Sequence, residues 1–93
     1  MIKSFRNKAL ARFADTGNTR GLSVQNPNRL RQMIQALAEA TKPSDMNLPG
    51  YRFHSLAPGQ PNRYAVNASA NWRLTFSFTA DGHAVEVDLE DYH

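Results

Sequence analysis

The hydrophobic period of the chain changes near residue 49, and this change constrains the fold more than any other feature. Before that point, apolar residues recur every three or four positions, as on one face of an α-helix. After it, apolar and polar residues alternate, as in a β-strand with one buried face. Helices in one half and alternating strands in the other favour the α+β class, with the helices on one face of an antiparallel sheet.

Two helices are predicted in the first half. The clearer one lies in NPNRLRQMIQALAEATKP, where Asn26 suits the N-cap, Pro27 suits the first turn and Pro43 marks the end. Its expected core face is the stripe Leu30, Met33, Ile34, Leu37 and Ala38. The earlier helix lies in RNKALARFADTG, where Gly17 suits the left-handed residue that ends a helix. Its apolar face holds Ala9, Leu10 and Phe13.

The second half is predicted to form an antiparallel meander. Strands are expected in YRFHSL, RYAVNA, NWRLTFSF and AVEVDLEDYH, and residues 2–5 are compatible with a further short strand. The pair Asp81-Gly82 favours a tight hairpin before the last strand, whose expected core face is Val85, Val87 and Leu89. We therefore predict a single domain, residues 1–93, with two N-terminal helices on a mainly antiparallel sheet of about four to five strands.

Polar side chains are expected on the uncovered face of this sheet. In NWRLTFSF, Arg73 points away from the side that carries Trp72 and Leu74. Arg52 and His54 are two residues apart on one strand and therefore share a face. If the two faces coincide, the exposed side of the sheet presents guanidinium groups beside an imidazole.

Composition argues against several classes of protein. The absence of cysteine removes disulfides and thiolate metal sites, and the three histidines lack metal-binding spacing, so we expect no metal and no cofactor. No apolar run approaches the about 20 residues of a membrane span, and the charged N-terminal stretch is unlike a secretory signal. We expect a cytoplasmic protein without membrane contact. The net charge of +3 permits attraction to a polyanion without requiring it.

Residue types suited to metal-independent RNA cleavage occur in the second half. Such cleavage needs a base for the ribose 2′-hydroxyl proton, an acid for the departing 5′-oxygen and a cation for the phosphorane. Histidine suits the first two tasks and arginine the third. His54, Arg73 and His93 supply these types, with Asp91 and Tyr92 beside the last. Each residue taken singly is more often structural, so the prediction depends on the fold bringing them together.

The chain resembles the HigB-like, or proteic killer, branch of the RelE/ParE superfamily of toxins from type II toxin-antitoxin modules. The resemblance runs from MIKSF through F-x-x-T-G-x-T-x-G at residues 13–21, NRLRQMIQALAEAT, LPGYRFHSL and NWRLTF to the terminal EDYH. Its most specific part is the arginine of N-W-R followed by D-Y-H at the end of the chain. It implies the compact α+β fold of microbial ribonucleases.

The resemblance also implies an activity and partners. Toxins of this kind cleave messenger RNA in the aminoacyl site of the ribosome, without a metal, by a 2′-hydroxyl attack that leaves a cyclic phosphate. The implied partner is a HigA-like helix-turn-helix antitoxin, through which operator DNA is contacted only indirectly. Carried over position by position, the catalytic residues are His54, Arg73, Asp91, Tyr92 and His93. His93 or Asp91 is the candidate base, with His54 the candidate acid.

One position departs from the family pattern. Many relatives have a lysine and then a glycine after H-x-L, where this chain has Ala57 and an apparent extra residue. Arg52 and Arg63 are candidate substitutes for this lysine, and we expect a milder toxin.

Contacts with RNA or with the ribosome are expected from a set of basic residues outside the catalytic group: Arg6, Lys8, Arg12, Arg29, Arg31, Arg52 and Arg63. For the helical cations, a solvated face or an antitoxin-binding surface is an equal alternative.

Two further functions remain open at this point. One is a ParE-like toxin that inhibits DNA gyrase and is not a nuclease, although such proteins generally lack the terminal D-Y-H. The other is a catalytically weak member that acts mainly by binding its antitoxin. Substitution of His93 or Arg73 separates these functions from a nuclease.

Overall fold

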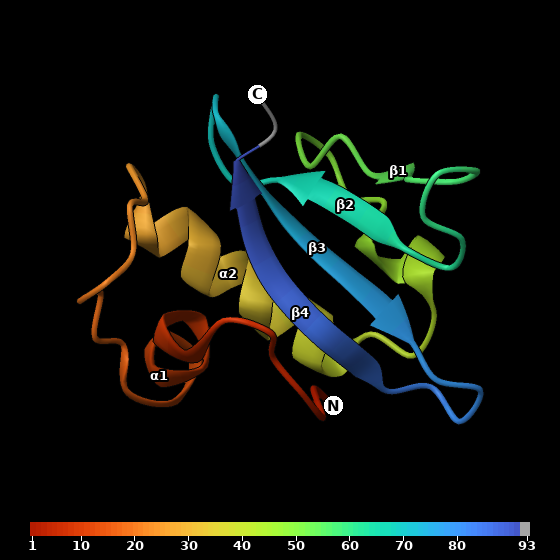
Figure 1. Ribbon diagram of the computed structural model, residues 1–93, viewed down its shortest axis with the longest axis horizontal. Helices are drawn as coiled ribbons and strands as arrows, with labels where there is room; N and C mark the ends of the chain where they lie inside the picture. The colour runs from red at the N-terminus through yellow and green to blue at the C-terminus, as the bar shows by residue number, and fades with distance from the viewer. Residues whose placement is uncertain (92–93) are drawn as a thin grey trace.

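The fold is a four-stranded antiparallel sheet with two helices on one side, seen in a computed structural model that describes residues 1–91 (Figure 1). The elements in chain order are α1 (Lys8–Thr16), α2 (Pro27–Glu39), the 3₁₀ turn η1 (Pro43–Met46), β1 (His54–Ser55), β2 (Tyr64–Asn67), β3 (Trp72–Phe78) and β4 (Ala84–Asp91). The strands are neighbours in chain order, so the sheet is a meander. This architecture confirms the predicted α+β class.

The predicted start of α2 at Asn26 and the predicted end of α1 at Gly17 are confirmed, whereas the predicted end of α2 at Pro43 is wrong, because α2 ends at Glu39 and Pro43 begins η1. Asn7 caps α1 by accepting a hydrogen bond from the amide of Leu10, and Asn26 caps α2 in the same way. Gly17 ends α1 with a left-handed φ of 79°, and its N–H donates to the carbonyl of Phe13. Both helices are therefore set by short-range chemistry that the sequence displays.

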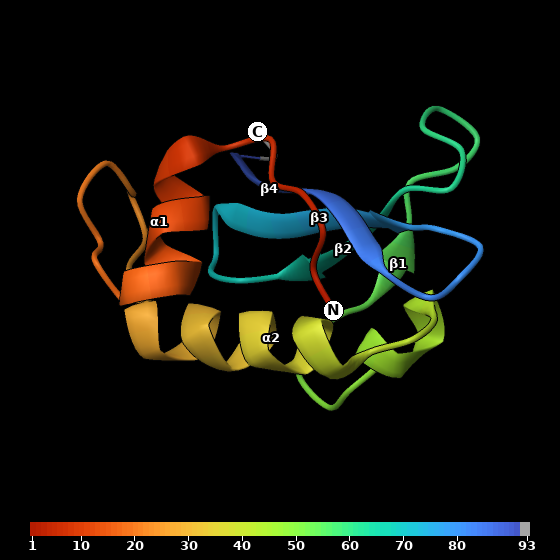
Figure 2. The same ribbon diagram turned by 90° about the horizontal axis from the view of Figure 1, so that it is seen from below.

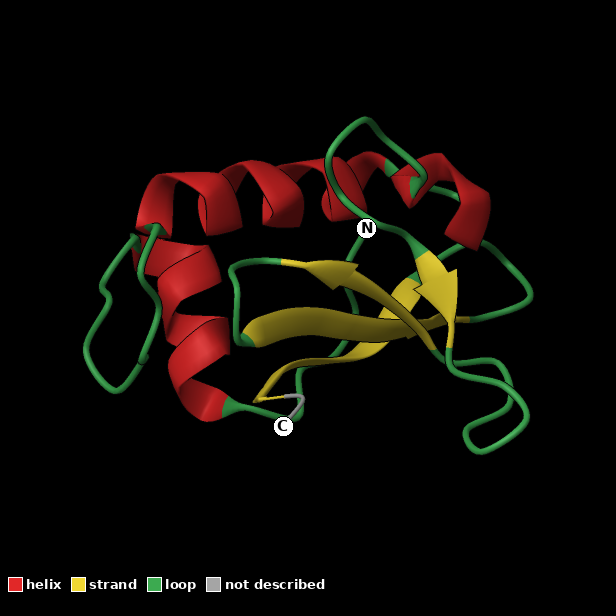
Figure 3. Cartoon of the chain, turned by 90° about the horizontal axis from the view of Figure 1, so that it is seen from above, coloured by secondary structure: helices red, strands yellow, loops and turns green. Residues whose placement is uncertain are grey.

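The helices cover one sheet face and leave the other open. Figures 2 and 3 show α2 running across the sheet, with α1 beside it at one end. The buried side chains between the layers come from both, and the largest are Leu10, Leu30, Met33, Leu37, Val66, Leu74, Phe76 and Val87. One predicted member of the stripe is wrong, because Ala38 is exposed and Ala40, just after the helix, is buried instead. None of the helices within residues 1–91 is long and apolar enough to cross a membrane.

A β-bulge changes the predicted pattern of β4. Thr75 pairs with Asp88 but Ser77 pairs with Val85, so β4 contains one extra residue between these pairs. Glu86 lies in this bulge with a φ of 54°. Val85 is consequently on the face of Ser77, not on the core face of Val87 and Leu89, and the prediction for Val85 is wrong.

The N-terminal segment, residues 2–5, supports the bulge from the edge of the sheet. Ile2 and Phe5 each form an isolated parallel bridge with β4, so the predicted first strand is present only as two contacts. The hydroxyl of Ser4 accepts the amide of Glu86 at 2.8 Å. This bond satisfies a backbone donor that the bulge removes from the ladder.

Candidate active site

Four predicted or neighbouring polar residues meet on the open face of the sheet. Asn67 pairs with Arg73 across β2 and β3, and His54 pairs with Ala65 across β1 and β2. Directly paired residues point to the same side of a sheet, as do residues two apart on one strand. Arg52, His54, Asn67 and Arg73 together line a pocket of about 300 Å³. The predicted coincidence of the two faces is therefore confirmed for Arg52, His54 and Arg73.

The imidazole of His54 has a defined hydrogen-bond partner. Its Nδ1 lies 2.8 Å from the carbonyl oxygen of Arg52. A carbonyl oxygen only accepts hydrogen bonds, so the proton of the neutral ring must reside on Nδ1. The other ring nitrogen, Nε2, is then the one that accepts a proton in the neutral state and donates one when the ring is charged.

The carbonyl that holds His54 belongs to a residue with unusual backbone geometry. Arg52 has a φ of 52°, in the left-handed region that residues other than glycine rarely adopt. This conformation interrupts the predicted strand YRFHSL, so that only His54–Ser55 pair with β2. Such backbone strain costs of the order of 1–3 kcal/mol and often accompanies functional sites. Here it accompanies the contact that orients the imidazole.

The end of β4 carries two acidic residues that lie on opposite sides of the sheet. Glu90 pairs with Arg73 and therefore lies on the open face, whereas Asp91 pairs with Trp72 on the other side of the sheet. The predicted residues Tyr92 and His93 lie outside the described residues. Of the five predicted catalytic residues, the pocket thus brings His54 and Arg73 together, and it adds Asn67. Asn67 was not predicted as a site residue. The sequence pattern that could have indicated it is its position two residues after Ala65 in RYAVNA, which puts both residues on one face of the strand.

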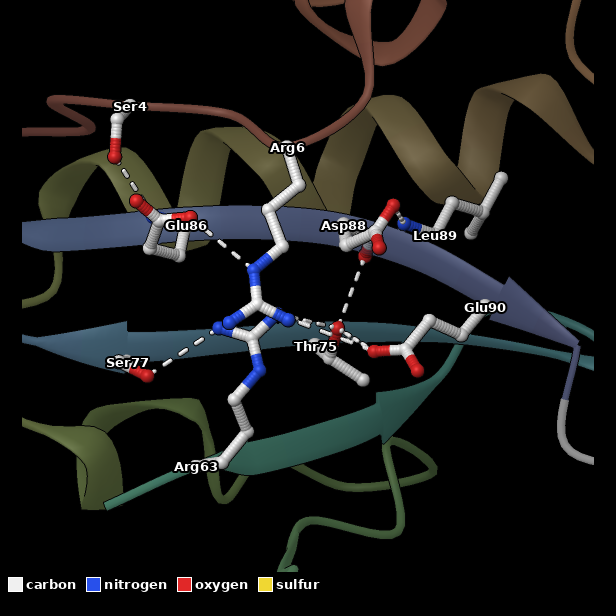
Figure 4. A network of polar contacts seen from close by, with 9 residues as sticks. All are labelled: Ser4, Arg6, Arg63, Thr75, Ser77, Glu86, Asp88, Leu89 and Glu90. Atoms are coloured by element: carbon white, nitrogen blue, oxygen red, sulfur yellow. Dashed lines mark hydrogen bonds and ion pairs between the residues drawn. The ribbon is translucent and has the colours of Figure 1, made fainter. Parts of the chain in front are cut away.

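Arg63 has a different environment from the one predicted (Figure 4). Its side chain is only 4% exposed. Its guanidinium donates to Ser77 Oγ at 3.3 Å and to Thr75 Oγ1 at 3.0 Å, and lies 3.9 Å from the Glu90 carboxylate. Burial lowers the pKa of Arg63 below its usual value, and the nearby charge of Arg6 acts in the same direction. A guanidinium held in this way is not accessible to RNA, and we do not retain Arg63 as an RNA contact.

The other predicted cations differ in how far they are engaged by the fold. Arg6 forms an ion pair with Glu86, with Nε 3.1 Å from Oε2 (Figure 4). Arg12 donates to the carbonyl of Arg20 at 3.1 Å. Arg31 donates to Asn28 and lies over the Phe13 ring. These contacts are exposed, so RNA binding by Arg6, Lys8, Arg12 and Arg31 stays a prediction.

Comparison with known proteins gives two matches. A family model described as the RelE-like toxin of type II toxin-antitoxin system HigB matches residues 3–93. The protein named Endoribonuclease HigB from Proteus vulgaris is 36% identical to this chain over 93 residues, which cover 100% of both chains.

Proposed function

Because the chain belongs to the HigB family of RelE-like toxins in type II toxin-antitoxin systems, we propose that it is an endoribonuclease that cleaves messenger RNA. The observation that carries this proposal is the pocket in which His54 and Arg73 meet on the open face of the sheet. The relative named Endoribonuclease HigB, which matches the chain over its full length, supports the same activity.

The proposed reaction is an internal transfer of the phosphodiester. A base removes the proton of the ribose 2′-hydroxyl, the 2′-oxygen bonds to phosphorus, and the bond from phosphorus to the 5′-oxygen breaks. The products are a 2′,3′-cyclic phosphate and a 5′-hydroxyl, whose proton comes from the acid. Side chains of this chain supply each role, so the proposal needs no cofactor.

The residues have the following proposed roles. Arg73 holds the non-bridging oxygens, because its fork matches phosphate geometry and keeps its charge. His54 is the acid, since the Nδ1 contact with Arg52 leaves Nε2 to deliver a proton. Of the two predicted bases we propose His93, because Asp91 pairs with Trp72 on the other side of the sheet from Arg73. Tyr92 stacks on or orients a base of the RNA.

The family membership gives this toxin an antitoxin partner. We propose that the antitoxin is HigA-like, with a helix-turn-helix that contacts operator DNA. We further propose that cleavage takes place on ribosome-bound message, and therefore in the cytoplasm. Exposed cations of the first third are the proposed ribosome contacts, which position the toxin without reading sequence.

The test is a map of new 5′ ends on a translated message, with and without ribosomes. Wild-type protein is expected to create new ends, and His54→Ala to lower their rate about 10²–10⁴-fold. Binding of the antitoxin by the variant is the control for its fold. A variant that binds its antitoxin and still cleaves at the wild-type rate contradicts the role of His54. If the wild type cuts no message and inhibits gyrase, the nuclease function itself is wrong.

A further inference from the structure

A second pocket adjoins the proposed active site on the open side of the molecule. Its volume is about 400 Å³, and it is lined by Arg29, Gly50, Arg52, Asn67, Ser69 and Ala70. Arg52 and Asn67 also line the pocket that holds His54 and Arg73. The two pockets are therefore adjacent, and a ligand as long as an RNA strand can contact both.

Arg29 is oriented in the second pocket by uncharged partners. Its Nη2 donates to the carbonyl of Gly50 at 2.7 Å and to the carbonyl of Asn67 at 3.1 Å. Its guanidinium carbon lies 5.5 Å from the centre of the Tyr51 ring. These partners fix the plane of the guanidinium and none of them neutralises its charge, so the group can still attract an anion.

Arg52 contributes a second cation where the two pockets meet. It is exposed and lines both pockets. The hydroxyl of Ser69 has no hydrogen-bond partner within residues 1–91, although its oxygen is shielded from solvent. Among the same residues, neither pocket is lined by a carboxylate. The chemistry of the second pocket is thus that of an anion site with two guanidinium groups.

We propose that the second pocket binds the phosphate next to the scissile phosphate of a single-stranded RNA. This inference rests on the proposed nuclease function, which puts the scissile phosphate beside Arg73. A single strand carries one phosphate for each nucleotide, so a neighbouring phosphate always accompanies the reacting one. Arg29 and Arg52 bind it as guanidinium groups bind phosphate oxygens, and the contact positions the message without reading its bases.

The experiment removes the charge of one flanking linkage at a time. Messages bound to ribosomes carry a single methylphosphonate, which keeps the shape of the linkage but is neutral, on either side of the cleavage point. Wild-type protein is expected to cleave about tenfold more slowly when one of these two linkages is neutral. Arg52→Asn is expected to lose about the same factor on the unmodified message and to be insensitive to that linkage. Asparagine tolerates the left-handed backbone, so the contact to His54 is kept.

Arg20→Asn is the matched control, because Arg20 is an exposed arginine that lines neither pocket. This variant is expected to keep the full sensitivity to the neutral linkage. The proposal is wrong if Arg52→Asn keeps that sensitivity too, or if neither flanking linkage matters to the wild type.

A second measurement separates failure of the pocket from failure of the nuclease function. A short single-stranded RNA with 2′-deoxyribose at the cleavage point is titrated into the free protein, and the backbone amide signals of Gly50, Arg52 and Ala70 are followed by NMR. If the wild type cleaves no message, shifts of these signals that vanish with the neutral linkage still support phosphate binding. Unchanged signals at saturating RNA overturn it.

Discussion

Arg63 and Arg73 lie on the same face of the same sheet and have opposite environments. Arg63 precedes β2, is buried, and donates to Thr75 and Ser77 beside the Glu90 carboxylate. Arg73, in the adjacent strand, lines a pocket with His54. The role of an arginine on an open sheet face, structural or functional, therefore depends on the groups that surround its guanidinium. The Glu90 carboxylate and two hydroxyl groups make Arg63 part of the fold. Arg73 lines a pocket in which, among residues 1–91, no carboxylate takes part, and its proposed role is to bind the phosphate of the substrate.

The largest expected effect is on catalysis at Arg73. Arg73→Ala should lower the single-turnover cleavage rate on ribosome-bound message about 10²–10³-fold, because one preorganised phosphate contact is lost. Arg73→Lys should recover part of this loss, since it keeps the charge but not the planar fork. Thermal unfolding and antitoxin binding are measured on both variants. Loss of activity only in proportion to lost folded protein would make Arg73 structural, like Arg63.

The next effect is on stability at Arg63. Arg63→Ala leaves Thr75, Ser77 and Glu90 without their guanidinium partner, and we expect a loss of about 2–4 kcal/mol in the free energy of unfolding. For a domain of this size, that loss lowers the melting temperature by about 10 °C or more. Urea unfolding measures it. Arg12→Ala, which removes an exposed arginine with one carbonyl contact, is the control and should change stability by less than about 0.5 kcal/mol.

The cleavage rate of folded Arg63→Ala protein tests whether Arg63 has only a structural role. Arg63→Ala protein that remains folded should cleave within about threefold of the wild type, because Arg63 reaches no substrate. A fall of 10²-fold in folded Arg63→Ala protein would show that this guanidinium also takes part in the reaction.

Local parts of this arrangement were predictable from sequence, and long-range parts were not. The caps at Asn26 and Gly17 depend on neighbouring residues, and the side of Arg73 follows from strand alternation. The burial of Arg63 depends on Glu90, which is distant in the chain and reaches it across two strand pairings.

Two other features could not be predicted from the sequence, because they depend on contacts made only in the folded chain. The bulge at Glu86 depends on pairing with β3 and on the hydroxyl of Ser4. The tautomer of His54 depends on the left-handed backbone of Arg52, which nothing in YRFHSL signals. The predicted strand there was too long because alternation alone does not reveal such a residue.

A smaller effect is expected at Ala57, the position where many relatives have a lysine. Ala57 is exposed in the loop after β1, and its amide donates to Ser55 Oγ at 3.1 Å. Ala57→Lys adds a cation three residues after His54 in the chain and should raise the cleavage rate about tenfold if a second phosphate contact is missing. Ala57→Gln is the neutral control of similar length. An unchanged or lower rate for Ala57→Lys would contradict the expectation that a phosphate contact is missing at this position.

The smallest expected effect is a loss of stability in acid from two carboxylates outside both regions. Hydrogen bonds from Thr41 to Asp45 and from Thr79 to Asp81 lower the pKa of each carboxyl below its usual 3.8. A lowered folded-state pKa contributes stability that is present above pH 3.8 and is lost as the pH falls through the folded-state value. The free energy of unfolding should therefore fall below about pH 4, and Asp45→Asn with Asp81→Asn should flatten that fall. Urea titrations at pH 3–6 measure this change in the free energy of unfolding.

This dependence of stability on pH does not involve Arg63, so it should persist in Arg63→Ala. The Arg63 and Arg73 variants are therefore compared above about pH 5, where these carboxyls are ionised. An acid slope that disappears in Arg63→Ala would instead place the titrating groups in the buried network of the open face.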